Sequence, residues 1–235
     1  MISIIIPTLN EEKYLPRLLD SIKSQKFNDY EIIVSDGGSS DSTVDLATNF
    51  GARVIIDGKI KSPSFQRNNG AAIAKGEILL FLDADSVLPS DFLVTADSAF
   101  KKYNLSAAGF YIKFNPNKWY YNIYSFISNT LSFLKQTTNH PAAIGAGLMA
   151  SRLAHEKNGG FDLEVLLAED YDYCARLAKD GKFRMIKNCQ LLYSSRRLEQ
   201  EGFFRSGWKW FKMGLFTLTH RRIKKQIVKY DFGKF

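Results

Sequence analysis

The chain has 235 residues, of which 45% are hydrophobic and 24% charged, and its net charge at pH 7 is +8. This composition excludes an intrinsically disordered chain and is sufficient for one sizeable hydrophobic core. No apolar run reaches the roughly 20 residues of a membrane-spanning helix, the N-terminus does not look like a signal peptide, and Cys174 and Cys189 fit no zinc or redox spacing. We therefore expect a cytoplasmic protein with reduced thiols.

The N-terminal part alternates short apolar runs with helical patterns, which predicts an α/β fold with a largely parallel sheet. β-branched runs predict strands, and Leu and Ile at intervals of three and four residues predict helices. Pro7 to Asn10 interrupt the first run, and the two glycines after Asp36 allow a sharp turn into the next helix. The expected elements are strands at 3–6, 31–35 and 53–56 and helices near 16–22 and at 43–50.

Five apolar residues, 78–82, lead directly into the carboxylates of Asp83 and Asp85. Such a run predicts a strand buried on both faces, and open α/β sheets bind ligands at the carboxyl ends of their strands. Side chains two positions apart in an extended segment point the same way. If the two carboxylates are buried, they would therefore repel each other unless a cation lay between them. Mg²⁺ and Mn²⁺ favour carboxylate and phosphate oxygens. The alternative is a strand end with two solvated acids.

The remaining pattern predicts helices at 63–74, 89–102 and 168–180, and strands at 107–113 and 183–193. Arg67 lies in the early part of the first of these helices, and Glu169 and Asp170 lie at the start of the last. Residues 117–135 form an aromatic-rich amphipathic pattern. Such a stripe is usually core, and contact with a membrane or a lipid acceptor is the alternative.

Four features, in this order and spacing, resemble the inverting glycosyltransferases of family two. They are the opening segment 3–12, Asp36 after the second strand, the Asp83-Ala84-Asp85 motif, and Glu169-Asp170. Segment 66–77 is also similar to the stretch that precedes the metal-binding strand in that family, and the similarity covers about residues 1–195. The resemblance implies the GT-A nucleotide-diphospho-sugar transferase fold, with a mostly parallel, Rossmann-like sheet flanked by helices, and inverting transfer of a single sugar.

The resemblance also implies how the donor binds. Asp36 would hydrogen-bond the nucleobase above Thr8, and Arg67 would contact the nucleotide; the alternatives are a helix cap and a solvated helix charge. Asp83 would lie near the ribose and sugar, and Asp85 would bind the Mn²⁺ or Mg²⁺ ion that bridges the diphosphate. The implied donor-binding residues are Pro7, Thr8, Asn10, Glu11, Asp36, Gly37, Arg67, Asp83, Ala84 and Asp85, with Asp85 and Asp83 as the metal ligands.

Asp170 matches the general base of the family, and Glu169 supports it. Displacement at an anomeric carbon needs an acceptor oxygen without its proton and a cation on the leaving diphosphate. A carboxylate provides the first, and the metal held by Asp83 and Asp85 the second. The alternative for Asp170 is that an acid is simply favourable at a helix N-terminus.

Two departures from the family pattern limit the acceptor. The chain lacks the later Gln and Arg-Trp motif of processive synthases, with Arg196, Arg197 and Trp208 as a loose echo, which favours single-sugar transfer. Val87 stands where dolichyl-phosphate sugar synthases have a metal-binding Gln, so a polyprenyl phosphate acceptor is less supported than other glycan or lipid acceptors. Two other functions stay open: a nucleotidyltransferase, and a catalytically silent protein that binds a sugar nucleotide at a membrane.

Residues 182–235 are strongly basic, whereas residues 1–181 carry a small net negative charge. In the C-terminal part, aromatic residues alternate with Lys and Arg, a composition typical of helices that lie on anionic membranes. Docking on the catalytic body is the alternative, and no recognisable nucleic-acid-binding module is present. We expect a catalytic domain at 1–200 that uses a UDP- or GDP-sugar, and an extension at 201–235 that contacts the cytoplasmic face of the membrane.

Overall fold

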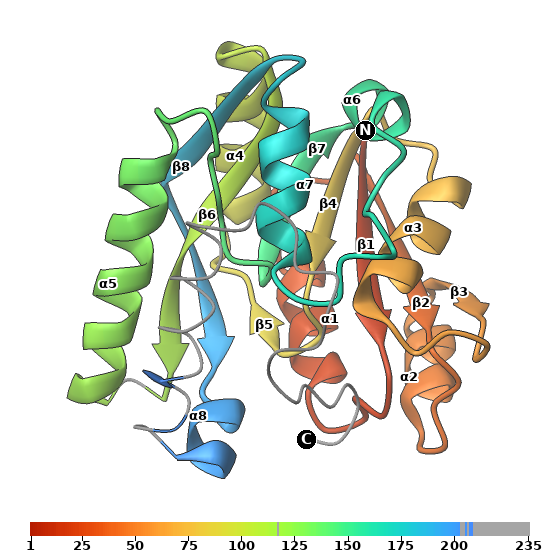
Figure 1. The fold of residues 1–235 in the computed structure, drawn as a ribbon. Coiled ribbons are helices and arrows are strands. Elements are labelled where there is room, and N and C mark those ends of the chain that lie inside the picture. The colour runs from red at the N-terminus through yellow and green to blue at the C-terminus, as the bar shows by residue number, and fades with distance from the viewer. Residues whose placement is uncertain (117, 203–204, 206, 209–235) are drawn as a thin grey trace.

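A computed structural model of the chain describes residues 1–116, 118–202, 205 and 207–208. Within these residues, one eight-stranded sheet is covered by helices on both faces (Figure 1). The strands are β1 (Ile2–Thr8), β2 (Tyr30–Asp36), β3 (Arg53–Ile56), β4 (Ile78–Leu82), β5 (Ser86–Val87), β6 (Leu105–Asn115), β7 (Gly147–Ser151) and β8 (Lys182–Ser194). The helices are α1 (Leu15–Lys23), α2 (Thr43–Phe50), α3 (Pro63–Ile73), α4 (Phe92–Lys102), α5 (Trp119–Lys135), α6 (Arg152–Lys157), α7 (Glu169–Leu177) and α8 (Arg196–Glu201).

The strand order is β3-β2-β1-β4-β7-β6-β8-β5. The first four strands are parallel, as the alternation of strands and helices predicts, whereas β7 runs antiparallel between β4 and β6 and makes the sheet mixed. Thr8 is in register with Asp36, and Ile5 with Phe81. The carboxyl ends of β1, β2 and β4 therefore meet at one edge, the edge at which α/β sheets bind ligands.

Side chains on alternate residues of the central strands build two cores, one on each face of the sheet. Ile4 and Ile6 of β1 pack in the core that α1 and α4 cover, and Ile5 packs in the core that α3 and α7 cover. In β4, Leu80 and Leu82 pack in the first of these cores, and Leu79 and Phe81 pack in the second. Both faces are buried, which is why these strands read as continuous apolar runs.

Two parts of the sheet differ from the sequence prediction. Strand β1 continues through Pro7 to Thr8, because the β1–β4 ladder ends at Ile5 and the missing N–H of Pro7 costs no bond on that side. Strand β7 lies in a run of Ala, Gly and Met that carries no β-branched signal, and β5, α6 and α8 are too short to show a period. These elements were not predicted.

Helix α5 is present as predicted, but the expectation that its aromatic stripe is core is wrong. Its buried residues are Tyr121, Ser125 and Ser132, while large apolar side chains such as Trp119 and Phe126 are 74% and 71% exposed. Among the described residues, no helix combines the length and apolar character needed to cross a bilayer. Most of the predicted extension, residues 203–204, 206 and 209–235, lies outside the described part of the chain.

Candidate functional site

Arg67 of α3 links the two acidic motifs of the chain. Its side chain is 3% exposed, and its guanidinium donates from Nη2 to Asp83 Oδ1 at 2.9 Å and from Nη1 to Glu169 Oε1 at 3.0 Å. The ring of Phe161 covers it, 5.2 Å from Cζ to the ring centroid. A buried guanidinium needs such partners because an unpaired charge is costly in the interior. Arg67 is therefore not a solvated helix charge, and it joins α3, the end of β4 and the start of α7.

Asp170 lies beside this pair at the N-terminus of α7. Its Oδ2 accepts a hydrogen bond from the Gly145 N–H at 2.7 Å, and its Oδ1 accepts one from the Tyr171 N–H at 2.9 Å. A Cβ on Gly145 would stand 3.2 Å from that Oδ2 and 3.4 Å from an Arg67 nitrogen, so glycine allows this close approach. The glycine-rich segment before β7 thus packs its backbone against the two side chains.

The surroundings of Asp170 move its acidity into the physiological range. Burial raises the pKa of Asp170 most, the charge of Glu169 raises it further, and Arg67 lowers it, with a net pKa of about 7. A carboxyl group with a pKa near the working pH can accept a proton and release it again, which is the property of a general base. Strongly shifted acids also mark functional sites in general.

A second cluster brings together Glu11, Asp85 and Arg196. Arg196, the first residue of α8, donates from both terminal nitrogens to the two Glu11 carboxylate oxygens at 2.7 Å, and from Nε to Asp85 Oδ2 at 2.8 Å. Its guanidinium also lies 4.4 Å from the centroid of the Tyr14 ring. Burial raises the pKa of Glu11, although Arg196 lowers it. The planar fork of arginine suits this bidentate contact.

Arg196 was not predicted as a site residue. Its partners Glu11 and Asp85 were, and the only sequence signal for the third member was the basic pair that follows the last strand. The contact joins the first loop, the Asp83-Ala84-Asp85 motif and the C-terminal end of the described chain. It therefore closes one side of the same sheet edge.

The two motif carboxylates, Asp83 and Asp85, each accept from a guanidinium, Asp83 from Arg67 and Asp85 from Arg196. Among the described residues, no group of three His, Cys, Asp or Glu side chains could hold a metal ion without further ligands. Mg²⁺ in nucleotide sites is commonly bound by one or two carboxylates together with substrate phosphates. A pair of carboxylates is therefore a donor set that fits an ion which binds together with a diphosphate, and in the structure Arg196 pairs with one of them, Asp85.

Asp36 holds the ends of β1 and β2 together. It is fully buried, its Oδ1 accepts from the backbone N–H groups of Gly38 and Ser39, and its Oδ2 accepts from the hydroxyls of Thr8 and Ser39. These contacts are those of a turn-forming Asp. They are not those of the helix cap that the sequence offered as the alternative, because α2 begins at Thr43 and its N-cap residue is Ser42. A contact with a nucleobase stays a prediction.

The other predicted donor residues line the same two loops. The Asn10 side chain accepts from the Ser40 N–H at 2.9 Å and so ties the loop after β1 to the loop after β2. A Cβ on Gly37 would meet the Gln66 side-chain nitrogen at 2.8 Å, so a larger residue there would require the Gln66 side chain to move. Pro7 is buried in β1, and Ala84 packs in the core. Their side chains shape the edge and do not present polar groups.

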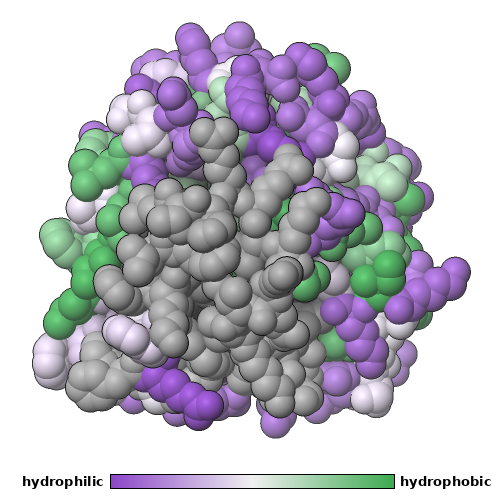
Figure 2. All heavy atoms as spheres, viewed as in Figure 1, coloured by the Kyte–Doolittle hydropathy of each residue, from purple (hydrophilic) through white to green (hydrophobic). Residues whose placement is uncertain are grey.

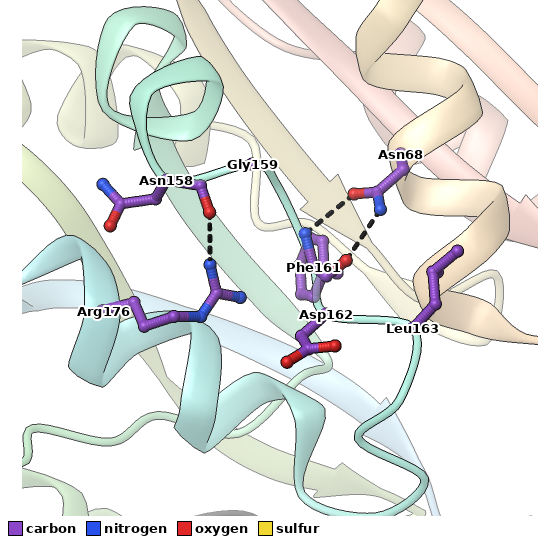
Figure 3. A pocket seen from close by; sticks show the side chains of 7 residues that line it. All are labelled: Asn68, Asn158, Gly159, Phe161, Asp162, Leu163 and Arg176. Atoms are coloured by element: carbon purple, nitrogen blue, oxygen red, sulfur yellow. Dashed lines mark hydrogen bonds between the residues drawn. The ribbon is translucent and has the colours of Figure 1, made fainter.

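A pocket of about 340 Å³ lies between α3, α7 and the loop that follows α6 (Figure 3). It is lined by Asn68, Asn158, Gly159, Phe161, Asp162, Leu163 and Arg176. None of the predicted site residues line it. Asn68 donates to the Phe161 carbonyl and accepts from the Phe161 N–H, both at 2.8 Å. This pair of bonds fixes the loop before α7 and, through it, the ring that covers Arg67.

Comparison with solved structures supports the fold. S. aureus TarS 1-349 superimposes with a TM-score of 0.69 at 20% identity, over 83% of this chain and 60% of that one. The mannosyltransferase PcManGT from Pyrobaculum calidifontis, in complex with GDP-Man and Mn²⁺, gives 0.68 at 21% identity, over 81% and 56%. At these identities the likeness shows the fold, which is that of the GT-A glycosyltransferases.

Sequence comparison gives closer relatives over a shorter stretch. A "PGL/p-HBAD biosynthesis glycosyltransferase" of Mycobacterium bovis is 45% identical over 93 residues, 37% of this chain and 36% of that protein. The "GalNAc(5)-diNAcBac-PP-undecaprenol beta-1,3-glucosyltransferase" of Campylobacter jejuni is 39% identical over 100 residues, 40% of this chain and 32% of that protein. The chain thus aligns with about a third of each of these relatives. The profile described as "Glycosyl transferase family 2" matches residues 3–159, more than half of the chain, and the protein therefore belongs to glycosyl transferase family 2.

Proposed function

We propose that this chain is a metal-dependent, inverting glycosyltransferase that moves one sugar from a nucleoside-diphosphate sugar to an acceptor at the cytoplasmic face of a membrane. The observation that carries the proposal is the buried Arg67 bridge between Asp83 and Glu169, with Asp170 beside it. Asp83 follows the strand end at which nucleotides bind in α/β folds. Asp170 has a pKa that suits a general base.

In this proposal each side chain has a separate task. Asp170 takes the proton of the acceptor hydroxyl while the hydroxyl oxygen of the acceptor attacks the anomeric carbon and the diphosphate leaves. The negative charge of Glu169 raises the pKa of Asp170 and so keeps it basic. Arg67, which binds both Asp83 and Glu169, holds the donor-binding end of β4 at a fixed distance from Asp170. Asp85, with Asp83 and the donor phosphates, would hold a Mn²⁺ or Mg²⁺ ion, which would neutralise the negative charge that develops on the leaving diphosphate.

The choice of donor and acceptor rests on the relatives. TarS has been solved with UDP and with UDP-GlcNAc, and PcManGT with GDP-Man, which supports a UDP- or GDP-sugar as donor. The Campylobacter relative is named for an undecaprenol-linked acceptor, and a Bacillus relative is named as a poly(ribitol-phosphate) beta-glucosyltransferase. The acceptor is accordingly a lipid-linked glycan or a polysaccharide, and the basic residues at 201–235 hold the enzyme at the membrane that carries it.

Donor binding tests this function first. In a thermal-shift panel of UDP-, GDP- and dTDP-sugars with Mn²⁺, one donor is expected to stabilise the protein by about 2.7 kcal/mol when present at roughly 100 times its Kd. Asp85→Ala is expected to remove the part of this shift that depends on Mn²⁺. Asp20→Ala, on the exposed face of α1, is the matched control and should respond as the parent does. A full Mn²⁺-dependent shift in Asp85→Ala would exclude the metal assignment.

The rate should depend on pH through Asp170. The active form of a general base is unprotonated, so kcat/KM is expected to rise with pH with a midpoint at about 7, the pKa of this carboxyl group. Glu169 raises that pKa by its charge, so Glu169→Gln should move the midpoint to lower pH. Measuring kcat/KM between pH 5 and 9 tests both statements. A midpoint that stays in place in Glu169→Gln would contradict the electrostatic role of Glu169.

A further inference from the structure

Helix α5 presents most of its large apolar side chains to solvent, and the side that faces the body holds Tyr121 and small polar side chains. The exposed residues recur at helical spacing along one face, whereas Ser125 and Ser132 are buried on the opposite face. This is the reverse of a surface helix in a soluble protein, whose apolar stripe faces the core. The exposed apolar residues are Trp119, Ile123, Phe126, Ile127, Leu131, Phe133 and Leu134, and we call them the outer face of α5.

Specific polar contacts fix this orientation. Asn129 accepts from the Ile112 N–H and donates to the Ile112 carbonyl, both at 2.9 Å, and so pairs with β6 as a neighbouring strand would. Rotating the helix to bury its apolar face would break both bonds and leave the backbone groups of Ile112 without these partners, which is costly. The outer face is therefore held outward by the fold.

The charges around the outer face are basic. No residue of α5 is acidic. The ammonium of Lys187 lies 5.4 Å from the ring centroid of Phe133, a residue of the outer face, and Lys118 lies at the N-terminus of the helix, 5.5 Å from the ring of the buried Tyr121. Glu199, which accepts a hydrogen bond from the Tyr121 hydroxyl, pairs with Lys118. Aromatic and aliphatic side chains with a basic border are typical of surfaces that insert into an anionic membrane interface.

The chain also leaves the described structure at this helix. A Cβ on Gly207 would stand 2.1 Å from the Tyr124 hydroxyl oxygen, so the backbone touches α5 at that point. The sequence that follows, 209–235, is rich in Lys and Arg and contains a single acid, Asp231. The described chain thus contacts α5 at Gly207, two residues before a strongly basic stretch of the sequence begins.

We propose that the outer face of α5 is a membrane-binding surface that inserts into the interfacial region of an anionic bilayer. In Figure 2, viewed as in Figure 1, hydrophobic residues gather along the edge of the molecule where α5 runs. A contiguous apolar area of this kind on a soluble domain marks an interaction site. The basic border and the basic C-terminal sequence select a negatively charged lipid surface as the partner.

The same surface leads to the candidate base. The ammonium of Lys135, the last residue of α5, lies 5.1 Å from the centroid of the Tyr171 ring, next to Asp170. Insertion of α5 would bring Asp170 close to the lipid headgroups, where a lipid-linked acceptor presents its hydroxyl. This step alone rests on the proposed function, whereas membrane binding through α5 does not.

Vesicle binding of the full chain tests the proposal. The protein should bind phosphatidylcholine vesicles that contain phosphatidylglycerol, and Phe126→Asp/Leu131→Asp should weaken that binding at least tenfold. Leu153→Asp/Ile56→Asp changes two residues that are 77% and 60% exposed elsewhere on the surface and is the matched control. It should bind as the parent does. The donor-induced thermal shift should be equal in all three proteins. This shift tests the proposed function, and vesicle binding tests the membrane surface, so the failure of one can be distinguished from the failure of the other.

Fluorescence separates α5 from the basic C-terminal sequence. Because Trp119 is 74% exposed, its insertion should shift the emission to shorter wavelength when vesicles are added, and Trp119→Phe should remove that part of the shift. An identical vesicle response in Trp119→Phe would overturn the proposal and assign binding to the C-terminal sequence. Unchanged vesicle binding of Phe126→Asp/Leu131→Asp would also overturn the membrane proposal. In that case, loss of a dimer in size-exclusion chromatography would show that a second copy of the chain covers the outer face of α5. A large fall in Tm would show that another part of the same chain covers it.

Discussion

Replacing Asp170 by Asn is expected to lower the rate of sugar transfer by a factor of about 10²–10⁴, the usual contribution of a general base. The amide cannot take the acceptor proton, and it has nearly the same shape as the carboxyl group it replaces. Donor binding should persist, because Arg67, Asp83 and Asp85 are unchanged. Single-turnover transfer and the donor-induced thermal shift, measured on the same preparation, test the two halves of this statement.

The stability of Asp170→Asn provides an internal check. Since burial raises the pKa of Asp170 from the ordinary value of 3.8 to about 7, folding favours the protonated form, and stability falls as pH rises from about 4 to about 7. A neutral Asn avoids this pH-dependent loss but can accept only one of the two backbone N–H bonds that Asp170 accepts from Gly145 and Tyr171. The stability of the variant should therefore be lower by the loss of one hydrogen bond and change less than that of the parent between about pH 4 and about pH 7. Asp20→Asn is the control for the same change on an exposed surface. Full transfer activity in Asp170→Asn would remove this residue as the base.

The sheet edge could be predicted because its signals are local. The apolar run 78–82 ends at Asp83, the run at 31–35 ends at Asp36, and parallel strands bring their carboxyl ends to one edge. The approach of Glu11 to Arg196 could not be predicted in this way, because the two residues are 185 positions apart and meet only through the complete fold. The same holds for Asp170 and the Gly145 backbone.

Helix α5 shows a different limit of sequence reasoning. The period of its apolar residues predicts a helix and a stripe, and it is the same whether the stripe faces the core or the solvent. What decides the orientation is the pair of hydrogen bonds from Asn129 to the backbone of Ile112 and the burial of Tyr121, Ser125 and Ser132 on the side of the helix that faces the body. Those contacts are tertiary. The stripe was accordingly assigned to the core from the sequence, and its exposure became visible only in the structure.

The Arg67→Met variant is expected to lose about 3 kcal/mol of unfolding free energy, the lower end of the range for removing one partner of a buried ion pair. The lower end applies because Asp83 and Glu169 are 27% and 22% exposed and water can solvate them in part. Met fills a similar volume, so the loss reports the charge and its hydrogen bonds. Urea unfolding of the parent and the variant at one pH measures it, with Arg17→Met on the exposed face of α1 as control.

Arg67→Met should also change the titration of Asp170 in a defined direction. Arg67 lowers the pKa of Asp170, so its removal should raise that pKa above 7 and move the midpoint of kcat/KM to higher pH, opposite to the shift expected for Glu169→Gln. Arg67→Lys retains the charge but has no fork with which to reach both acids, so it should keep the midpoint near that of the parent while recovering only part of the stability. A midpoint unchanged in Arg67→Met, together with full stability, would mean that the bridge between the two acidic motifs has no part in holding the site.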